Sequence, residues 1–175
     1  MILKFRIISP EKENFARDIE IFDDSSFLEL HEAIQLSCDY DPSIMTSFYV
    51  SNERWEKKEE IVMQIMDEEE QKESLLMDST PLNRFFNHKG QRLIYIYDFF
   101  SVRLFLLEVV NIREFEKSDE SLEFPICTLC SGIPPQQIKV EEISEMRYED
   151  EITDDFDDLD NIDPSEFDDI ENYDL

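Results

Sequence analysis

The acidic residues of this chain are concentrated at one end, which limits the part that can fold. Of the 175 residues, 44 are Asp or Glu and 16 are Lys or Arg, for a net charge of −28. Residues 141–175 hold 17 of the acidic residues and a single basic one, Arg147. Such a segment repels itself and buries too little apolar surface to fold alone. We therefore predict one domain over residues 1–138 and a disordered acidic tail over residues 139–175, because a chain of this length supports one core.

The start of the chain has the pattern of a β-hairpin followed by a helix. In ILKFRII, apolar residues alternate with Lys4 and Arg6, and ARDIEIF repeats the alternation after the turn-like SPEKEN. Next, Ser26 and Glu29 have the spacing of a capping box. The residues behind them are apolar at helical spacing, namely Phe27, Leu30, Ile34 and Cys38. The sequence therefore predicts a helix over residues 26–38.

The rest of the body is rich in strand-forming runs. MTSFYVS and EEIVMQIM indicate short strands, and QRLIYIYDFF with VRLFLLEVVNI predicts a long central hairpin over residues 92–112. Between them, DEEEQKES indicates a solvated loop or short helix. STPLNRFFNHKG predicts a helix capped by Thr80, starting at Pro81 and stopping at Gly90. This order predicts an α+β fold, a mostly antiparallel sheet with one main helix packed across it in a β-grasp-like arrangement.

Charge and composition exclude several classes of function. Sequence-independent nucleic-acid binding needs Lys and Arg to neutralise phosphates, so we expect no direct contact with nucleic acid or with an anionic membrane. No window approaches 18 uninterrupted apolar residues, and three cysteines are too few for a secreted disulfide framework, so we expect a cytoplasmic protein. Two glycines, Gly90 and Gly132, cannot build a phosphate cradle. We expect no cofactor and no nucleotide hydrolysis.

The cysteines and histidines supply the candidate metal ligands. Cys127 and Cys130 form a lone C-x-x-C, whereas zinc requires four ligands. The other candidate ligands are Cys38, His31 and His88, and His31 lies two helical turns from Cys38. We interpret Cys127 and Cys130 as ordinary loop thiols, with a zinc site or a redox pair as the alternatives.

Three further polar residues have simple structural interpretations. His31 lies on the apolar face of the predicted helix and is typical of a core histidine. His88 lies at the end of the second predicted helix, where it would complement the helix dipole. Asp98 ends an aromatic strand and is expected to hydrogen-bond the backbone of its own turn. The alternative is a carboxylate pair with Asp39 or Asp41 for acid–base chemistry.

Three segments carry a resemblance to a known family. LELHEAIQLSCDYDPSIMTSF, YIYDFFSVRLFLLEVV and PICTLCSGIPPQ occur in the order and spacing of the plasmid pRi ORF-three-like family, also described as insertion-element passenger proteins. The chain resembles this family over residues 1–138. The resemblance implies a compact α+β domain without an established catalytic activity, often carried on mobile elements.

The chain departs from the family pattern at its histidines. The pattern has Trp-Asp followed by His-x-His, and later Tyr-Asp-Phe-Gly-Asp followed by another His. This chain has other residues there, namely Tyr40-Asp41, Ile44 and Thr46 in the first stretch and Phe100, Ser101 and Phe105 in the second. Of that histidine set, His31 remains. If the histidines form a metal or catalytic site in relatives, this member lacks it, which favours a non-enzymatic protein.

The acidic tail carries regularly spaced apolar residues. They are Phe156, Leu159, Ile162, Phe167, Ile170 and Tyr173. Each half of the tail would form one apolar stripe if helical, and helices this short need a partner surface to be stable. We therefore interpret these six residues as a ligand for an apolar groove with basic edges on a partner protein.

The combined hypothesis is a non-catalytic protein-interaction or adaptor module linked to mobile elements. One alternative is an acidic DNA mimic that regulates a nucleic-acid-binding protein. Another is a vestigial metal-dependent enzyme, and a third is a tail that serves only solubility. The aromatic spacing favours the groove ligand over charge mimicry, because imitation of phosphates requires no Phe.

Overall fold

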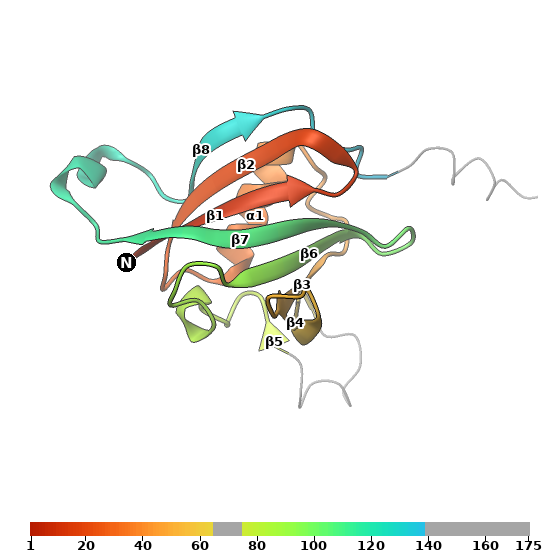
Figure 1. Cartoon of the computed structure of the whole chain (residues 1–175), viewed down its shortest axis with the longest axis horizontal. Coiled ribbons are helices and arrows are strands. Elements are labelled where there is room, and N and C mark those ends of the chain that lie inside the picture. The colour runs from red at the N-terminus through yellow and green to blue at the C-terminus, as the bar shows by residue number, and fades with distance from the viewer. Residues whose placement is uncertain (65–74, 139–175) are drawn as a thin grey trace, which may run out of the picture. The chain divides into compact units, whose positions relative to one another are not determined.

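One open sheet forms the framework of the protein. In the computed structural model, which describes residues 1–64 and 75–138, eight strands follow the order β5-β4-β3-β6-β7-β1-β2-β8 (Figure 1). All neighbouring strands are antiparallel except β4 and β5. The strands are β1 (Ile2–Ser9), β2 (Lys12–Phe22), β3 (Ser47–Ser51), β4 (Lys57–Val62), β5 (Leu75–Leu76), β6 (Arg92–Asp98), β7 (Arg103–Arg113) and β8 (Ile126–Ser131). The predicted α+β class is confirmed, and the β6–β7 hairpin lies at the centre of the strand order.

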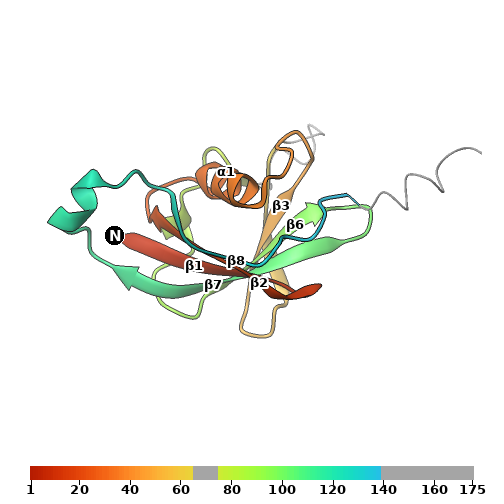
Figure 2. The ribbon, with the colours of Figure 1, turned by 90° about the horizontal axis from the view of Figure 1, so that it is seen from above.

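Within the described residues, one α-helix, α1 (Phe27–Cys38), covers one face of this sheet (Figure 2). Its capping box is formed as the spacing predicts. The Ser26 hydroxyl accepts a hydrogen bond from the Glu29 amide at 3.2 Å, and the Glu29 carboxylate accepts one from the Ser26 amide at 2.7 Å. The helix ends where Asp39 adopts a left-handed conformation, with φ of 55°.

The core lies between α1 and the sheet and is largely aromatic. Phe5 meets Phe86 edge-on at 5.1 Å between ring centroids, Phe15 stacks on Phe105 at 5.0 Å, and Phe27 contacts a ring of β3. Because strand side chains alternate between faces, β1, β2, β6 and β7 each send one row into this layer. Full burial of such side chains contributes roughly 1.5–3 kcal/mol each.

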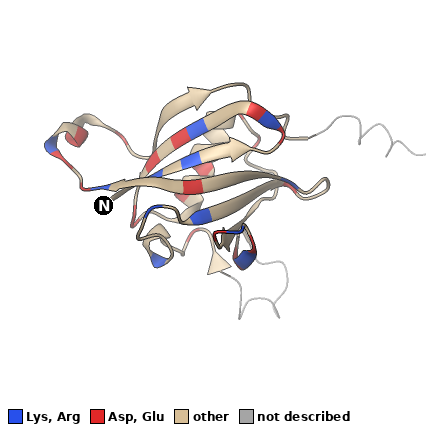
Figure 3. Cartoon of the chain, viewed as in Figure 1, with Lys and Arg blue, Asp and Glu red and all other residues tan. Residues whose placement is uncertain are grey.

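The opposite face of the sheet carries paired charges instead of a second layer. Arg6 and Lys4 on β1 bind Asp18 and Glu20 on β2 at 2.7 and 2.9 Å, and Arg113 on β7 also binds Glu20 at 2.8 Å. Figure 3 shows basic and acidic residues beside each other on these strands. The side chains of Lys4, Arg6 and Arg113 are 26–49% exposed and cover the nearly buried carboxylates. The main consequence of these pairs is that this face is compatible with water.

The prediction of a helix at Pro81 is wrong. The segment holds only a 3-10 turn at Leu82–Arg84, and no side chain caps it. Its backbone bonds instead to the residues that precede α1: Phe27 donates to the Thr80 carbonyl at 3.1 Å, and Leu82 donates to the Ser25 carbonyl at 2.8 Å. These long-range bonds replace the local bonds that a helix would need.

Three other elements differ from expectation. β4 begins at Lys57, before the predicted EEIVMQIM strand, and β5 and β8 have no counterpart in the prediction. The predicted loop DEEEQKES and the predicted disordered tail, residues 139–175, lie outside the described residues. Within residues 1–64 and 75–138, no helix is long and apolar enough to cross a membrane.

Removal of the capping side chain should destabilise the fold. We expect Ser26→Ala to lower the free energy of unfolding by about 1 kcal/mol, because the Glu29 amide at the start of α1 loses its side-chain acceptor. Urea denaturation followed by circular dichroism measures this loss. Ser26→Asp is the matched control, since its carboxylate also accepts the Glu29 amide; equal stability of the Ala variant and the unmodified protein would contradict the prediction.

Candidate functional site

A polar cluster lies in the middle of the aromatic core. The Tyr95 hydroxyl on β6 is 2.9 Å from His31 Nδ1 and accepts a hydrogen bond from the Gln35 amide, and both partners come from α1. Thr46 Oγ1, just before β3, is 3.2 Å from the same His31 nitrogen. All four side chains are buried. The prediction that His31 is a core histidine is confirmed.

Burial sets the protonation of this cluster. His31 is 1% exposed, and loss of hydration lowers its pKa from 6.5 to about 4. Burial also raises the pKa of Tyr95 far above its ordinary value. Because Gln35 donates to the tyrosine oxygen, the hydroxyl can donate to Nδ1 of a neutral imidazole, which then carries its proton on Nε2. This arrangement orients side chains and does not exchange protons near neutral pH.

Two positions that lack the family histidines adjoin this cluster. Thr46 contacts His31, and the ring of Phe105 stacks on Tyr95 at 6.4 Å between centroids. Residues 31, 46 and 105 are far apart in sequence, yet all three surround Tyr95. Ile44, the third replaced position, is only partly buried. Residues 31, 46 and 105 thus share Tyr95 or His31 as a neighbour.

Asp98 has the turn role that its position predicts. One carboxylate oxygen accepts hydrogen bonds from the amides of Phe100 and Ser101 at 3.0 and 3.3 Å. Asp41 likewise accepts the Ser43 amide at 2.9 Å, and Asp39 ends α1. The Asp98 and Asp41 carboxylates thus bind the backbone of their own turns, as the structural interpretation predicts, and Asp98 also lies 4.0 Å from the Arg103 guanidinium.

A buried arginine connects the central hairpin to the end of the described chain. The Arg103 guanidinium forms two bonds to the Glu11 carboxylate, at 2.8 and 3.0 Å, and donates to the Gln136 carbonyl at 2.5 Å. Next to it, the Tyr40 hydroxyl donates to the Pro135 carbonyl at 2.6 Å. These contacts hold residues 135–137 against the turn end of the β6–β7 hairpin.

The interpretation of Cys127 and Cys130 as loop thiols is wrong, since both belong to strand β8. Their sulfur atoms are 2.9 Å apart. Cys38 is buried at the end of α1. Among residues 1–64 and 75–138, no group of three or more His, Cys, Asp or Glu side chains is arranged to hold a metal ion.

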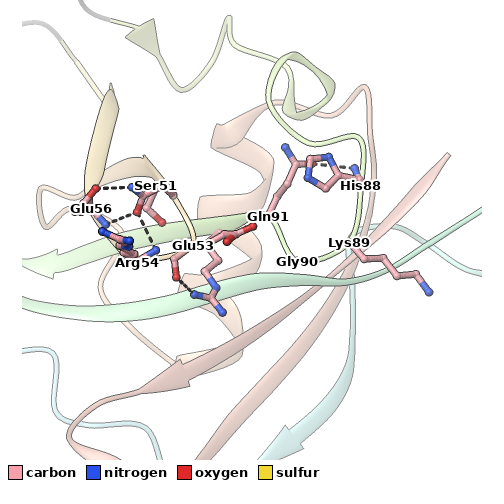
Figure 4. Close-up of a pocket in the computed structure, with 10 residues that line it drawn as sticks. Ser51, Glu53, Arg54, Glu56, His88, Lys89, Gly90 and Gln91 are labelled. Carbon is pink, nitrogen blue, oxygen red and sulfur yellow. Dashed lines mark hydrogen bonds between the residues drawn. The ribbon is translucent and has the colours of Figure 1, made fainter.

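An open polar pocket of about 570 Å³ lies where the β3–β4 turn faces the loop before β6 (Figure 4). The side-chain oxygen of Asn52 accepts the amides of Arg54 and Glu56, and that of Gln91 accepts the amides of Asn87 and His88. The pocket is lined by Ser51, Asn52, Glu53, Arg54, Glu56, His88, Lys89, Gly90, Gln91 and Arg92. Its polar groups mainly stabilise their own turns.

The pocket changes the interpretation of two residues. His88 does not follow a helix, and its Nδ1 is 2.7 Å from the Asn87 side-chain oxygen at the pocket wall. Arg92 bonds to the Glu53 carbonyl and to Glu108, with its guanidinium 4.7 Å from the Trp55 ring centre. Sequence reasoning missed this pocket, and the turn residues Asn52 and Gly90 were its only signal.

The predicted groove-binding residues of the tail lie outside the described residues.

The pKa of His31 predicts how stability depends on pH. The unfolded chain binds a proton on this histidine near pH 6.5, whereas the folded protein resists it down to about pH 4. Stability from this residue is therefore fully present above pH 6.5 and is lost as the pH falls. Between pH 7 and pH 5 the loss should be about 2 kcal/mol.

The measurement is urea unfolding at pH 7 and pH 5 for the unmodified protein and for His31→Gln. Between pH 7 and pH 5, we expect the free energy of unfolding of His31→Gln to fall by about 2 kcal/mol less than that of the unmodified protein. His88→Gln is the matched control, because it removes the surface histidine. If both variants respond to acid like the unmodified protein, His31 is not the group responsible.

Comparisons with known proteins place this geometry in context. Among solved structures, a protein of unknown function from Methanosarcina mazei Go1 has a TM-score of 0.60 at 20% identity, with 74% of this chain and 68% of that chain covered. That likeness shows the fold alone. A comparison with curated proteins gives no match. The model of the plasmid pRiA4b ORF-3-like proteins matches residues 2–168, beyond the last described residue. Because this match spans most of the chain, the protein belongs to the plasmid pRiA4b ORF-3-like family.

Proposed function

We propose that the protein is a non-catalytic protein-interaction module. The observation that carries this proposal is an apolar turn at the tip of the β6–β7 hairpin, formed by Phe99, Phe100 and Val102. Phe100 is 89% exposed, Val102 61% and Phe99 42%. Large apolar side chains grouped at a protruding turn are typical of a contact surface for another protein. We call these three residues the apolar tip.

The apolar tip is held in shape by its backbone. Asp98 binds the amides of Phe100 and Ser101, and Val102 adopts a left-handed conformation with φ of 51°. This conformation is unfavourable for a β-branched residue and persists only where surrounding bonds impose it. A turn already fixed in this way loses little conformational entropy on binding.

The described part of the chain ends close to the apolar tip. Arg103, at the start of β7, holds the Gln136 carbonyl, and the described chain ends two residues later at Ile138. The family match continues to residue 168, so it includes Phe156, Leu159, Ile162 and Phe167. The apolar tip and the apolar residues of the tail each suit a partner with an apolar surface and a basic groove.

A non-catalytic role is supported by the state of the retained histidine. His31 is enclosed by Tyr95, Gln35 and Thr46, and its low pKa keeps it neutral. The family name refers to a plasmid open reading frame, which supports a link to mobile elements. The acidic charge supports a protein partner rather than direct contact with nucleic acid.

Partner capture from host lysate by the full-length protein tests the proposal. We expect that Phe100→Ser with Val102→Ser, or Phe156→Ser with Phe167→Ser, reduces capture of a specific protein at least about tenfold, because the apolar surface buried on binding is lost. Neutralising the acidic tail should have a smaller effect at physiological salt. That control changes six Asp residues to Asn, namely Asp154, Asp155, Asp157, Asp158, Asp168 and Asp169.

The remaining outcomes separate the alternatives. If the Ser variants capture the partner normally while the Asn variant fails, charge mimicry of DNA replaces the groove ligand. If deletion of residues 141–175 changes solubility and nothing else, the tail has no binding role. If neither the tip nor the tail variants alter capture, the interaction module is located elsewhere or does not exist.

A second candidate, a vestigial metal-dependent enzyme, is favoured by the convergence of residues 31, 46 and 105 around Tyr95. If relatives hold a metal there, Thr46→His with Phe105→His should restore zinc binding, measured as bound metal per chain after dialysis. Adding His31→Gln should abolish it. Failure of a folded double variant to bind zinc contradicts this candidate; Thr46→His alone serves as the control for folding.

A further inference from the structure

A β-bulge in β8 places two cysteines on one face of the strand. Opposite β2, Cys127 pairs with Ile19, Leu129 with Asp18, and Cys130 with Arg17. The β8 segment thus has one residue more than its partner. In a regular strand, residues three apart point to opposite faces. Here the extra residue, Thr128, changes the alternation. Cys127 and Cys130 therefore lie on the same side of β8, because their partners Ile19 and Arg17 lie on one side of β2.

The two sulfur atoms are close enough to react. Their separation is 2.9 Å, whereas a disulfide bond is about 2.0 Å long. The remaining difference is within reach of a small side-chain rotation. We propose that Cys127 and Cys130 form a reversible dithiol–disulfide site that exchanges with low-molecular-weight disulfides such as oxidised glutathione.

The two thiols have different surroundings. Cys130 is exposed, whereas Cys127 is partly buried and its thiol lies 3.2 Å from the Leu129 carbonyl. Burial, together with the hydrogen bond to Cys130, raises the pKa of Cys127 to about 12. Cys130 is therefore the thiol that meets the external disulfide first, and Cys127 is the one that resolves the mixed disulfide.

Arg17 fixes the strand that carries the pair. Its buried guanidinium donates to the Ser37 carbonyl of α1 at 3.1 Å and to the carbonyls of Ser131 and Gly132 at 2.6 and 3.2 Å. Gly132 has φ of +69°, and a Cβ there would lie 2.2 Å from the Asn14 carbonyl oxygen, so the chain passes very close to β2. These constraints keep the thiols together in the reduced protein.

The reaction balances as two successive exchanges. The Cys130 thiolate attacks one sulfur of oxidised glutathione, which forms a mixed disulfide and releases one glutathione thiolate. The Cys127 sulfur then attacks Cys130 Sγ, which closes the protein disulfide and releases the second glutathione. Two electrons and the two thiol protons pass to the glutathione disulfide, which becomes two glutathione thiols.

The experiment measures how much the fold favours this disulfide. The reduced full-length protein is equilibrated anaerobically with mixtures of reduced and oxidised glutathione, free thiols are trapped by alkylation, and peptides are mapped by mass spectrometry. The same titration in concentrated urea is the control. We expect the Cys127–Cys130 disulfide to form, with an equilibrium constant at least about tenfold larger in the folded protein, because the bulge already juxtaposes the thiols.

Variants identify the pair. Cys38→Ser should leave the equilibrium unchanged, because Cys38 is buried at the end of α1. Cys127→Ser should stop at a mixed disulfide of glutathione on Cys130. An equilibrium constant no larger in the folded protein than in urea, or a disulfide that includes Cys38, would overturn the proposal. The comparison of folded with urea-unfolded protein uses the unmodified chain. Misfolding of a variant therefore does not affect the result of that comparison.

Discussion

A hydroxyl group in the middle of an aromatic core must be hydrogen-bonded, and the Tyr95 hydroxyl determines much of this fold. An unpaired hydroxyl buried there would cost roughly 1–3 kcal/mol. His31 and Gln35, one helical turn apart, both reach it, so these contacts favour the observed register of α1 on the sheet. The surrounding rings of Phe48 and Phe105 exclude water from the contact. The cluster around the Tyr95 hydroxyl therefore joins α1, the central strand β6 and the segment before β3.

This arrangement divides the protein into an inner and an outer part. The face under α1 contains the core, and the opposite face carries the paired charges of β1, β2 and β7. The features with chemical or binding potential lie at the margins: the apolar tip, the polar pocket and the bulged strand β8. Substitutions at these margins leave the Tyr95 contacts intact. Fold and function can thus be altered separately by experiment.

Local patterns predicted the elements whose bonds are local. Alternation identified the β1–β2 and β6–β7 hairpins, and the Ser26–Glu29 spacing identified the start of α1. The prediction of a helix from Pro81 was wrong, because backbone groups of this segment bond to Ser25 and Phe27. No local sequence pattern indicates such long-range bonds. Strand β8 was not predicted, because its bulge interrupts the alternation of side chains that identifies a strand. For the site, the buried role of His31 followed from its helical face, whereas the proximity of Cys127 to Cys130 depends on pairing with β2.

The two edges of the sheet have a consequence for assembly. An open sheet presents unpaired backbone groups at each end, onto which a strand of another molecule can add. Among the described strands, one edge is β5, which is only two residues long, and the other is β8, which the bulge kinks. Neither offers a long, flat template. The same irregularity that brings two sulfur atoms together therefore also discourages the growth of this sheet into a fibre.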